Sequence, residues 1–141
     1  MNIPIYRAKK INSNEYVEGF LHSETLEYIQ GGEMSQDQYN TKEEEWFIMS
    51  NNGFNNDLID PSTLAIHFTD MLDSQGNKIF ASLDEYMLKG ASILENYMFQ
   101  GDYKIQHAVY SEGCICVMDK DGEKYNIYEN GHQLKIIGIQ E

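Results

Sequence analysis

The sequence predicts a mainly β domain with one short helix, in which an antiparallel meander curls into a half-barrel or a small barrel. Short apolar or alternating segments recur along the chain, as is typical of strands. Turn residues separate them, including Asp-Gly and Asn-Gly pairs, which accept positive φ at both central positions of a hairpin. A single sheet of many short strands exposes two edges, and curling or pairing between subunits is the usual remedy.

The N-terminal third reads as a β-meander followed by a loop. Segments 3–11, 15–21 and 25–29 have strand character, and the last alternates polar and apolar residues. The polar composition of 31–45 predicts an exposed loop. Residues 46–49 are apolar without alternation, which indicates a strand covered on both faces.

The middle of the chain predicts a hairpin and then a helix. In 59–80, two short apolar runs flank the turn-forming cluster 73–77. Ser82 and Glu85 then have the spacing of a capping box, and Gly90 is a good residue to end a helix. We therefore expect a short helical insertion over 81–90.

The C-terminal third predicts an antiparallel meander. Its apolar segments are separated by Gly-Asp, Ser-Glu-Gly, Asp-Gly and Asn-Gly turn signals. The expected strands are 92–100, 103–110, 114–118, 124–128 and 133–139.

Length and charge limit the possible functions. At 141 residues the chain fits one domain, 1–141, which would bury roughly 65–70% of its unfolded surface. The net charge of −13 argues against binding to DNA or RNA, whose affinity for proteins comes mainly from Lys and Arg. A basic protein partner is easier to accommodate, although solubility alone is the simpler explanation of the acidity. Without a signal peptide or a long apolar run, we expect an intracellular protein that does not bind membranes.

No cofactor or metal site is predicted. Cys114 and Cys116 would share one face of a strand, and we expect two buried, reduced thiols because no zinc-type Cys/His set accompanies them. Segment 119–123 is interpreted as a hairpin turn, since a calcium loop of the EF-hand type needs more oxygen ligands. The histidines have no metal-motif spacing and lie far apart, at His22, His67, His107 and His132.

The chain is predicted not to be an enzyme. It has no phosphate loop, nucleophile elbow or paired Cys cluster, and nothing nominates a nucleophile. Aromatic residues of the C-terminal strands are the candidate protein-binding residues, together with one acidic run that would attract a basic partner. Core packing and plain solvation remain the alternatives for these two groups. The candidates are Tyr97, Phe99, Tyr103, Tyr125, Tyr128, Glu43, Glu44 and Glu45.

Three stretches resemble the YopX family of phage and prophage proteins. Ile5-Tyr6-Arg7-Ala8 is similar to the family's opening residues, and 134–139 resembles its closing "vIGNiyE". The most specific stretch is 61–80, which follows the signature "fTGLkDknGkkIyeGD". The resemblance implies a mostly β fold of a meander or half-barrel kind, and a phage-derived protein of the host bacterial cytoplasm without established enzyme chemistry.

The sequence departs from that signature near its end. Asp70 and Met71 stand where the family has Gly and Leu, and Ala81-Ser82 replaces the expected Gly-Asp. Segment 81–89 then reads as an insertion. We therefore carry over no functional residue from the family.

Three hypotheses of function follow. The first is a non-enzymatic accessory protein that binds a host or phage protein. The second is a structural protein that self-associates through its strand edges. An enzyme is the third, and it would require a pocket with two or more titratable groups of mutually perturbed pKa. The sequence leaves the partner, the oligomeric state and the strand order open.

Overall fold

The computed structural model describes residues 4–30, 39–50, 55–97, 103–126 and 134–141. These residues form one mixed, mostly antiparallel sheet of eleven strands and one 3₁₀ helix, η1 (Pro61–Thr63). The first six strands are β1 (Ile5–Lys9), β2 (Tyr16–Gln30), β3 (Tyr39–Met49), β4 (Asn56–Leu58), β5 (Ala65–His67) and β6 (Ala81–Ser82). The other five are β7 (Ser92–Tyr97), β8 (Tyr103–Ser111), β9 (Cys114–Met118), β10 (Lys124–Asn126) and β11 (Leu134–Ile139). Within this part of the chain, no helix has the length and apolar character needed to cross a membrane.

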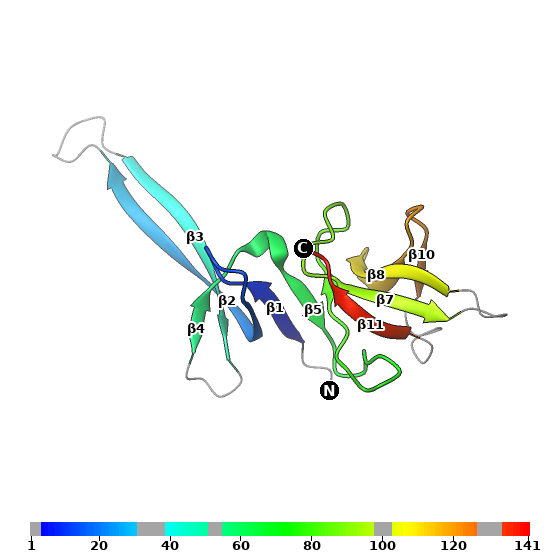
Figure 1. The fold of residues 1–141 in the computed structure, drawn as a ribbon. Helices are drawn as coiled ribbons and strands as arrows, with labels where there is room; N and C mark the ends of the chain where they lie inside the picture. The colour runs from blue at the N-terminus through cyan, green and yellow to red at the C-terminus, as the bar shows by residue number, and fades with distance from the viewer. Residues whose placement is uncertain (1–3, 31–38, 51–54, 98–102, 127–133) are drawn as a thin grey trace.

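The sheet is open, so the prediction of a barrel or half-barrel is wrong. Its strand order is β10-β9-β8-β6-β5-β1-β2-β3-β4, and β7 pairs with both β8 and β11 (Figure 1). Among the pairings of the described strands, the single contact between β6 and β8 is the parallel one. The two end strands, β4 and β10, have three residues each, and such short edges offer few unpaired backbone groups. Among the described residues, the longer open edges belong to β11, which pairs with β7, and to the outer parts of β2 and β3.

The predicted turns are confirmed where the structure describes them. Glu112 and Gly113 have positive φ angles of 54° and 80° in the tight β8–β9 turn. In the β9–β10 turn, the Asp119 carboxylate accepts hydrogen bonds from the amides of Asp121 and Glu123, and Gly122 has φ 83°. The interpretation of 119–123 as a hairpin turn is correct.

The central hairpin is also confirmed, and Asp73 fastens its turn to β11. One carboxylate oxygen of Asp73 accepts from the amides of Gln75 and Asn77, and the other accepts from the amide of Ile136 at 3.1 Å. Burial raises the pKa of Asp73, but these hydrogen bonds outweigh it and leave the pKa below its usual value. Further along, β5 and β6 pair as antiparallel strands.

The helix predicted over 81–90 is absent. Ala81–Ser82 form β6, and two turns follow, over 85–87 and 89–90; in the first, the Asp84 carboxylate accepts from the amides of Tyr86 and Met87. Leu88 and Gly90 then adopt left-handed φ angles of 59° and 79°, which end the turn before it becomes a helix. The expected capping box does not form, because Glu85 bonds to Ser111 and Lys124 instead.

Two apolar clusters hold the sheet together. The larger one is built on Ile79, Leu94, Val117 and Leu134, all fully buried. The smaller one lies under the base of the β2–β3 hairpin and contains Ala8, Ile48 and Ile59, with Leu21 and Trp46 packed against it. Residues 46–49 are therefore covered on only one face, since Met49 is exposed, and the expectation of a strand covered on both faces is wrong.

Candidate functional site

The β2–β3 hairpin projects from the body of the sheet as a long arm (Figure 1). Its strands pair continuously from Phe20↔Met49 to Gln30↔Tyr39. Strand β1 pairs with β2 only as far as Gly19, and β4 pairs with β3 only from Phe47 to Met49. Among the described residues, the outer arm (Glu24–Gln30 and Tyr39–Glu45) therefore pairs only with itself, and both of its edges are open. A lone two-stranded ribbon is marginally stable in water, so a partner would add to its stability.

Gly19 allows the arm to leave the sheet. A Cβ atom at this position would lie 1.9 Å from the carbonyl oxygen of Met49, far inside contact distance. Strand β2 can therefore pass from β1 to β3 at this point only because residue 19 has no side chain. The sequence marks Gly19 as one glycine within a strand segment, but only the register with β3 reveals this close approach.

The arm carries the acidic run, which corrects the loop predicted over 31–45. Glu43, Glu44 and Glu45 belong to β3, while 31–38 lie outside the described residues. Glu45 is directly opposite Glu24 in β2, and Glu44 is opposite Thr25. The β3 half of the ribbon, Tyr39–Glu45, has polar residues at nearly every position, so its sequence lacks the apolar periodicity that identified 25–29 as a strand. Like charges directly opposite each other destabilise a strand pair, which a cationic group placed between them would relieve.

An apolar strip lies at the base of the arm, on the face opposite the smaller core cluster. We define the strip as Phe20, Phe47, Met49 and Leu58. The register places Phe20 across from Met49 and Phe47 across from Leu58, so the four side chains share one face. Phe20 is 46% exposed, and Met49 and Leu58 are each 37% exposed. A contiguous group of exposed apolar side chains is the feature that most often marks a protein-binding surface.

His22 lies between the strip and the Glu24–Glu45 pair on the same face of the hairpin. Its ring stacks on Phe47, with centroids 5.3 Å apart and planes at 15°, and its Nε2 lies 2.6 Å from Asn56 Oδ1. Along β2 the same face then reaches Glu24, which is exposed and opposite Glu45. The strip and a pair of carboxylates are thus adjacent on one face of the hairpin.

The structure does not bring the candidate aromatic residues together with the acidic run. Tyr97 and Tyr103 are opposite each other at the end of β7 and β8, and their side chains lie outside what the structure describes, as do Phe99 and Tyr128 entirely. Tyr125 in β10 is 38% exposed and donates a hydrogen bond to Glu123 at 2.6 Å. Strands β10 and β3 are far apart in the strand order, so these residues are two separate surfaces.

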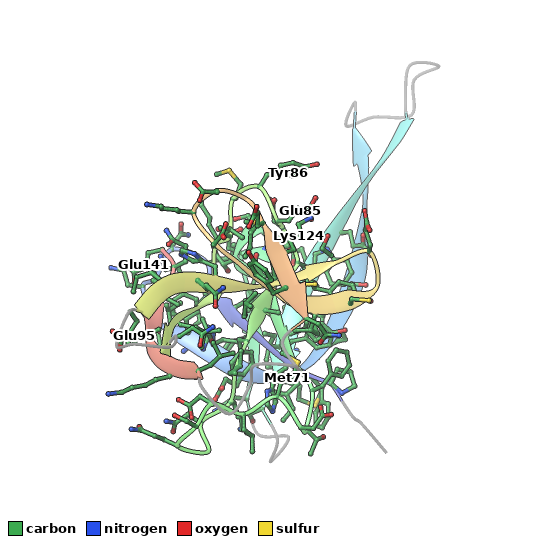
Figure 2. The ribbon with its side chains drawn as sticks, turned by 90° about the vertical axis from the view of Figure 1, so that its right-hand side faces the viewer. Met71, Glu85, Tyr86, Glu95, Lys124 and Glu141 are labelled. Carbon is green, nitrogen blue, oxygen red and sulfur yellow. The ribbon has the colours of Figure 1, made fainter. Side chains whose placement is uncertain are left out.

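Among the described residues, the most exposed large hydrophobic side chain lies in the turn after β6. Tyr86 is 88% exposed, and it points away from the body beside Glu85 and Lys124 (Figure 2). Lys124 Nζ lies 2.7 Å from Glu85 Oε2 and 3.0 Å from the Ser111 hydroxyl. The hydrogen bonds from Lys124 and Ser111 lower the pKa of Glu85, and the bond with Glu85 raises the pKa of Lys124. Lys124 is therefore held as a cation and is unsuited to act as a base.

Histidines and cysteines do not converge in the described part of the chain. His67 is buried with Nδ1 3.0 Å from the carbonyl oxygen of Ile79, and burial lowers its pKa. His107 pairs with Gln140, and His132 lies outside the described residues. No group of three His, Cys, Asp or Glu side chains there could hold a metal ion.

The thiols differ from expectation. Cys114 is exposed and Cys116 is half-buried, so the prediction of two buried cysteines is wrong. Ile115 and Val117 take the core-facing positions of β9, which leaves both cysteines on the other face, as the alternation predicted. Burial raises the pKa of the Cys116 thiol, which disfavours a reactive thiolate.

Comparison with models of protein families, with curated proteins and with solved structures gave no match to this chain. The resemblance to the YopX family thus stays a prediction. The candidate site is defined by the geometry of the arm. The sequence patterns did not predict the apolar strip at its base. The cross-strand register supplies the signal, because it alone places Phe20, Phe47, Met49 and Leu58 on one face.

Proposed function

We propose that this chain is a YopX-like accessory protein of phage or prophage origin that acts in the host cytoplasm by binding another protein, without enzyme chemistry. The apolar strip on the open face of the β2–β3–β4 hairpin carries the proposal. Apolar residues at the centre of a contact and charges around it are the usual anatomy of an interface, and the strip with Glu24 and Glu45 has that composition.

The partner that fits this surface is a basic protein with an apolar residue at its contact. The chain has a net charge of −13, and Glu24 and Glu45 face each other beside the strip. Lys or Arg side chains of a partner would lie between these two carboxylates and reduce their repulsion. The negative electrostatic field of the whole chain would also increase the rate at which a basic partner associates with it. Because this attraction is electrostatic, binding should weaken as salt concentration rises.

Self-association is the alternative use of the arm, since its two edges can pair with another strand. Charge favours a different protein: two copies would bring together arms that each carry Glu24, Glu43, Glu44 and Glu45. Sedimentation at micromolar concentration separates the two cases. A monomer excludes self-association, whereas a stable dimer that forms through the arm would replace the proposal.

A capture experiment with matched variants tests the strip. The full chain is immobilised and mixed with host lysate at moderate salt, and retained proteins are quantified. We expect one retained basic protein to be lost with Met49→Gln and with Phe20→Gln. Met87→Gln is the control, since Met87 is also an exposed methionine, at 57%, but lies outside the strip. Retention of nothing, or equal retention by Met49→Gln and Met87→Gln, would contradict the proposal.

A further inference from the structure

Arg7 in β1 is a buried cation whose directly opposite neighbour in β2 is Glu18. Its side chain is only 9% exposed, and Nη2 donates to the carbonyl oxygen of Gly90 at 2.6 Å. The Phe80 ring lies against the guanidinium, with 4.2 Å between Cζ and the ring centroid. Nε is buried and has no hydrogen-bond partner. Among the described residues no carboxylate oxygen lies within 4 Å of Arg7, although buried charges are normally paired.

Lys9 is a second such cation on the same face of β1. Residues 7 and 9 of a strand point to one side, and Tyr16 of β2 is opposite Lys9. Lys9 Nζ and Arg7 Cζ each lie 5.7 Å from the centroid of the Tyr16 ring. In the part of the chain that the structure describes, the Lys9 ammonium has no ion pair, and the Tyr16 hydroxyl is buried without a partner.

A shortage of acids does not explain these unpaired cations. The chain has 23 acidic and 10 basic residues. The adjacent Lys10 has two carboxylates near it, from Glu15 at 3.1 Å and Asp57 at 3.7 Å. Burial, only partly offset by Glu18 and Tyr16, lowers the pKa of Arg7 to about 10, so it stays charged at neutral pH. Glu18 lies directly opposite Arg7 in the register of β1 and β2, but among the described residues no carboxylate oxygen comes within 4 Å of the Arg7 guanidinium or the Lys9 ammonium.

We propose that Arg7 and Lys9 bind a carboxylate group, supplied by a small organic acid or by the C-terminus of a peptide. Since Nη2 is bonded to Gly90 and Nε is enclosed, Nη1 is the guanidinium nitrogen left for a ligand. Nη1 and the Lys9 ammonium supply donors to the two oxygens of a carboxylate. A phosphate group brings three oxygens and a second negative charge, which the net charge of −13 repels more strongly.

The surroundings of Lys9 leave room for the rest of the ligand. Lys9 lines an open groove of about 510 Å³ with Lys10, Asp60 and the turn 12–14. Asn12, Ser13 and Asn14 give this groove polar walls that suit a hydrogen-bonding ligand. The site lies on β1 and requires neither the arm nor a protein partner, so it stands apart from the proposed function.

Titration with acetate, followed by NMR chemical shifts at constant ionic strength, tests the site. We expect saturable shifts at Arg7, Lys9 and Tyr16. Loss of one charge-assisted hydrogen bond in Lys9→Gln should weaken binding roughly tenfold, while Lys124→Gln should change it by less than about twofold. Lys124→Gln is the matched control, because it removes the same charge from a lysine that lies outside the groove and whose ammonium already contacts the Glu85 carboxylate.

Two further probes identify the chemical group and its source. N-acetyl-trialanine with a free carboxylate should bind, and its C-terminal amide should not. Tighter binding of this peptide than of acetate assigns the site to peptide termini, and equal binding assigns it to small acids. The proposal is overturned by linear shifts without saturation, by equal binding of the amide, by tighter binding of inorganic phosphate than of acetate, or by equal losses in Lys9→Gln and Lys124→Gln.

Discussion

Replacing Gly90 by alanine should destabilise the fold far more than the same change in an open turn. Gly90 has φ 79°, and a Cβ atom there would lie 2.1 Å from the carbonyl oxygen of Thr63. Thr63 cannot easily retreat, because its hydroxyl accepts from the Lys9 amide at 2.9 Å and donates to the Asp60 carbonyl at 2.7 Å. The Gly90 backbone would have to move, which would disturb its hydrogen bond with Arg7.

The expected cost follows from these contacts. A left-handed conformation costs a residue with a Cβ about 1–2 kcal/mol relative to glycine. Loss of the hydrogen bond from the Arg7 guanidinium adds about 1.5–3 kcal/mol, the range for bonds to charged groups. Gly90→Ala should therefore lower the free energy of unfolding by about 2.5–5 kcal/mol. Gly76→Ala should cost only the first amount, since Gly76 has φ 84° and nothing lies within 4 Å of its added Cβ.

Urea unfolding measures both losses. Trp46 is the only tryptophan and packs against the smaller core cluster, so its fluorescence reports unfolding there, and far-UV circular dichroism reports the sheet. The dependence of the free energy on urea concentration should stay the same in both variants. Equal losses in Gly90→Ala and Gly76→Ala would refute the argument from the Thr63 contact.

Three other predictions concern stability. Asp73→Ala leaves the partly buried amide of Ile136 without its acceptor and should cost about 1–3 kcal/mol in urea unfolding, while an unchanged midpoint would contradict the role of this carboxylate. Burial holds the pKa of His67 below 6.5, so below about pH 6.5 the unfolded chain binds a proton that the folded chain excludes, and stability should fall as pH decreases from there. In His67→Asn, the free energy of unfolding should change less with pH between about pH 6.5 and 5, and Asp73 and Glu85 titrate below this range. An unchanged slope of this free energy against pH would exclude His67 as the cause of the pH dependence. Lys124→Gln should cost less than Asp73→Ala in the same assay, because the Glu85–Lys124 pair is near the surface, and a larger loss would contradict this ranking.

Local patterns predicted most strands and turns of the C-terminal third. Alternation places Ile115 and Val117 toward the core and Cys114 and Cys116 away from it, because side chains of a strand alternate between faces whatever the rest of the fold does. Turn residues mark their own positions for the same reason, as at Gly122. These signals depend on a few neighbouring residues, so they can be identified without knowing the fold.

The wrong predictions concern segments whose structure depends on contacts with residues far away in the chain. The polar run around Glu44 became a strand because β2 supplies its hydrogen bonds, and a sequence pattern cannot reveal a partner strand. Segment 81–90 did not become a helix because Glu85 is held by Ser111 and Lys124, and Gly90 is enclosed by Thr63 and Arg7.

The sequence by itself determined a mainly β chain of short strands and tight turns with a strongly acidic balance, since these properties reside in single residues and their nearest neighbours. Only the tertiary structure decided that the sheet stays open, that an arm leaves it at Gly19 and that Phe20 and Met49 remain exposed together. It also decided that Arg7 and Lys9 both lie beside the Tyr16 ring. Register and burial are set by residues far apart in the chain, and they determine which side chains remain available to a partner.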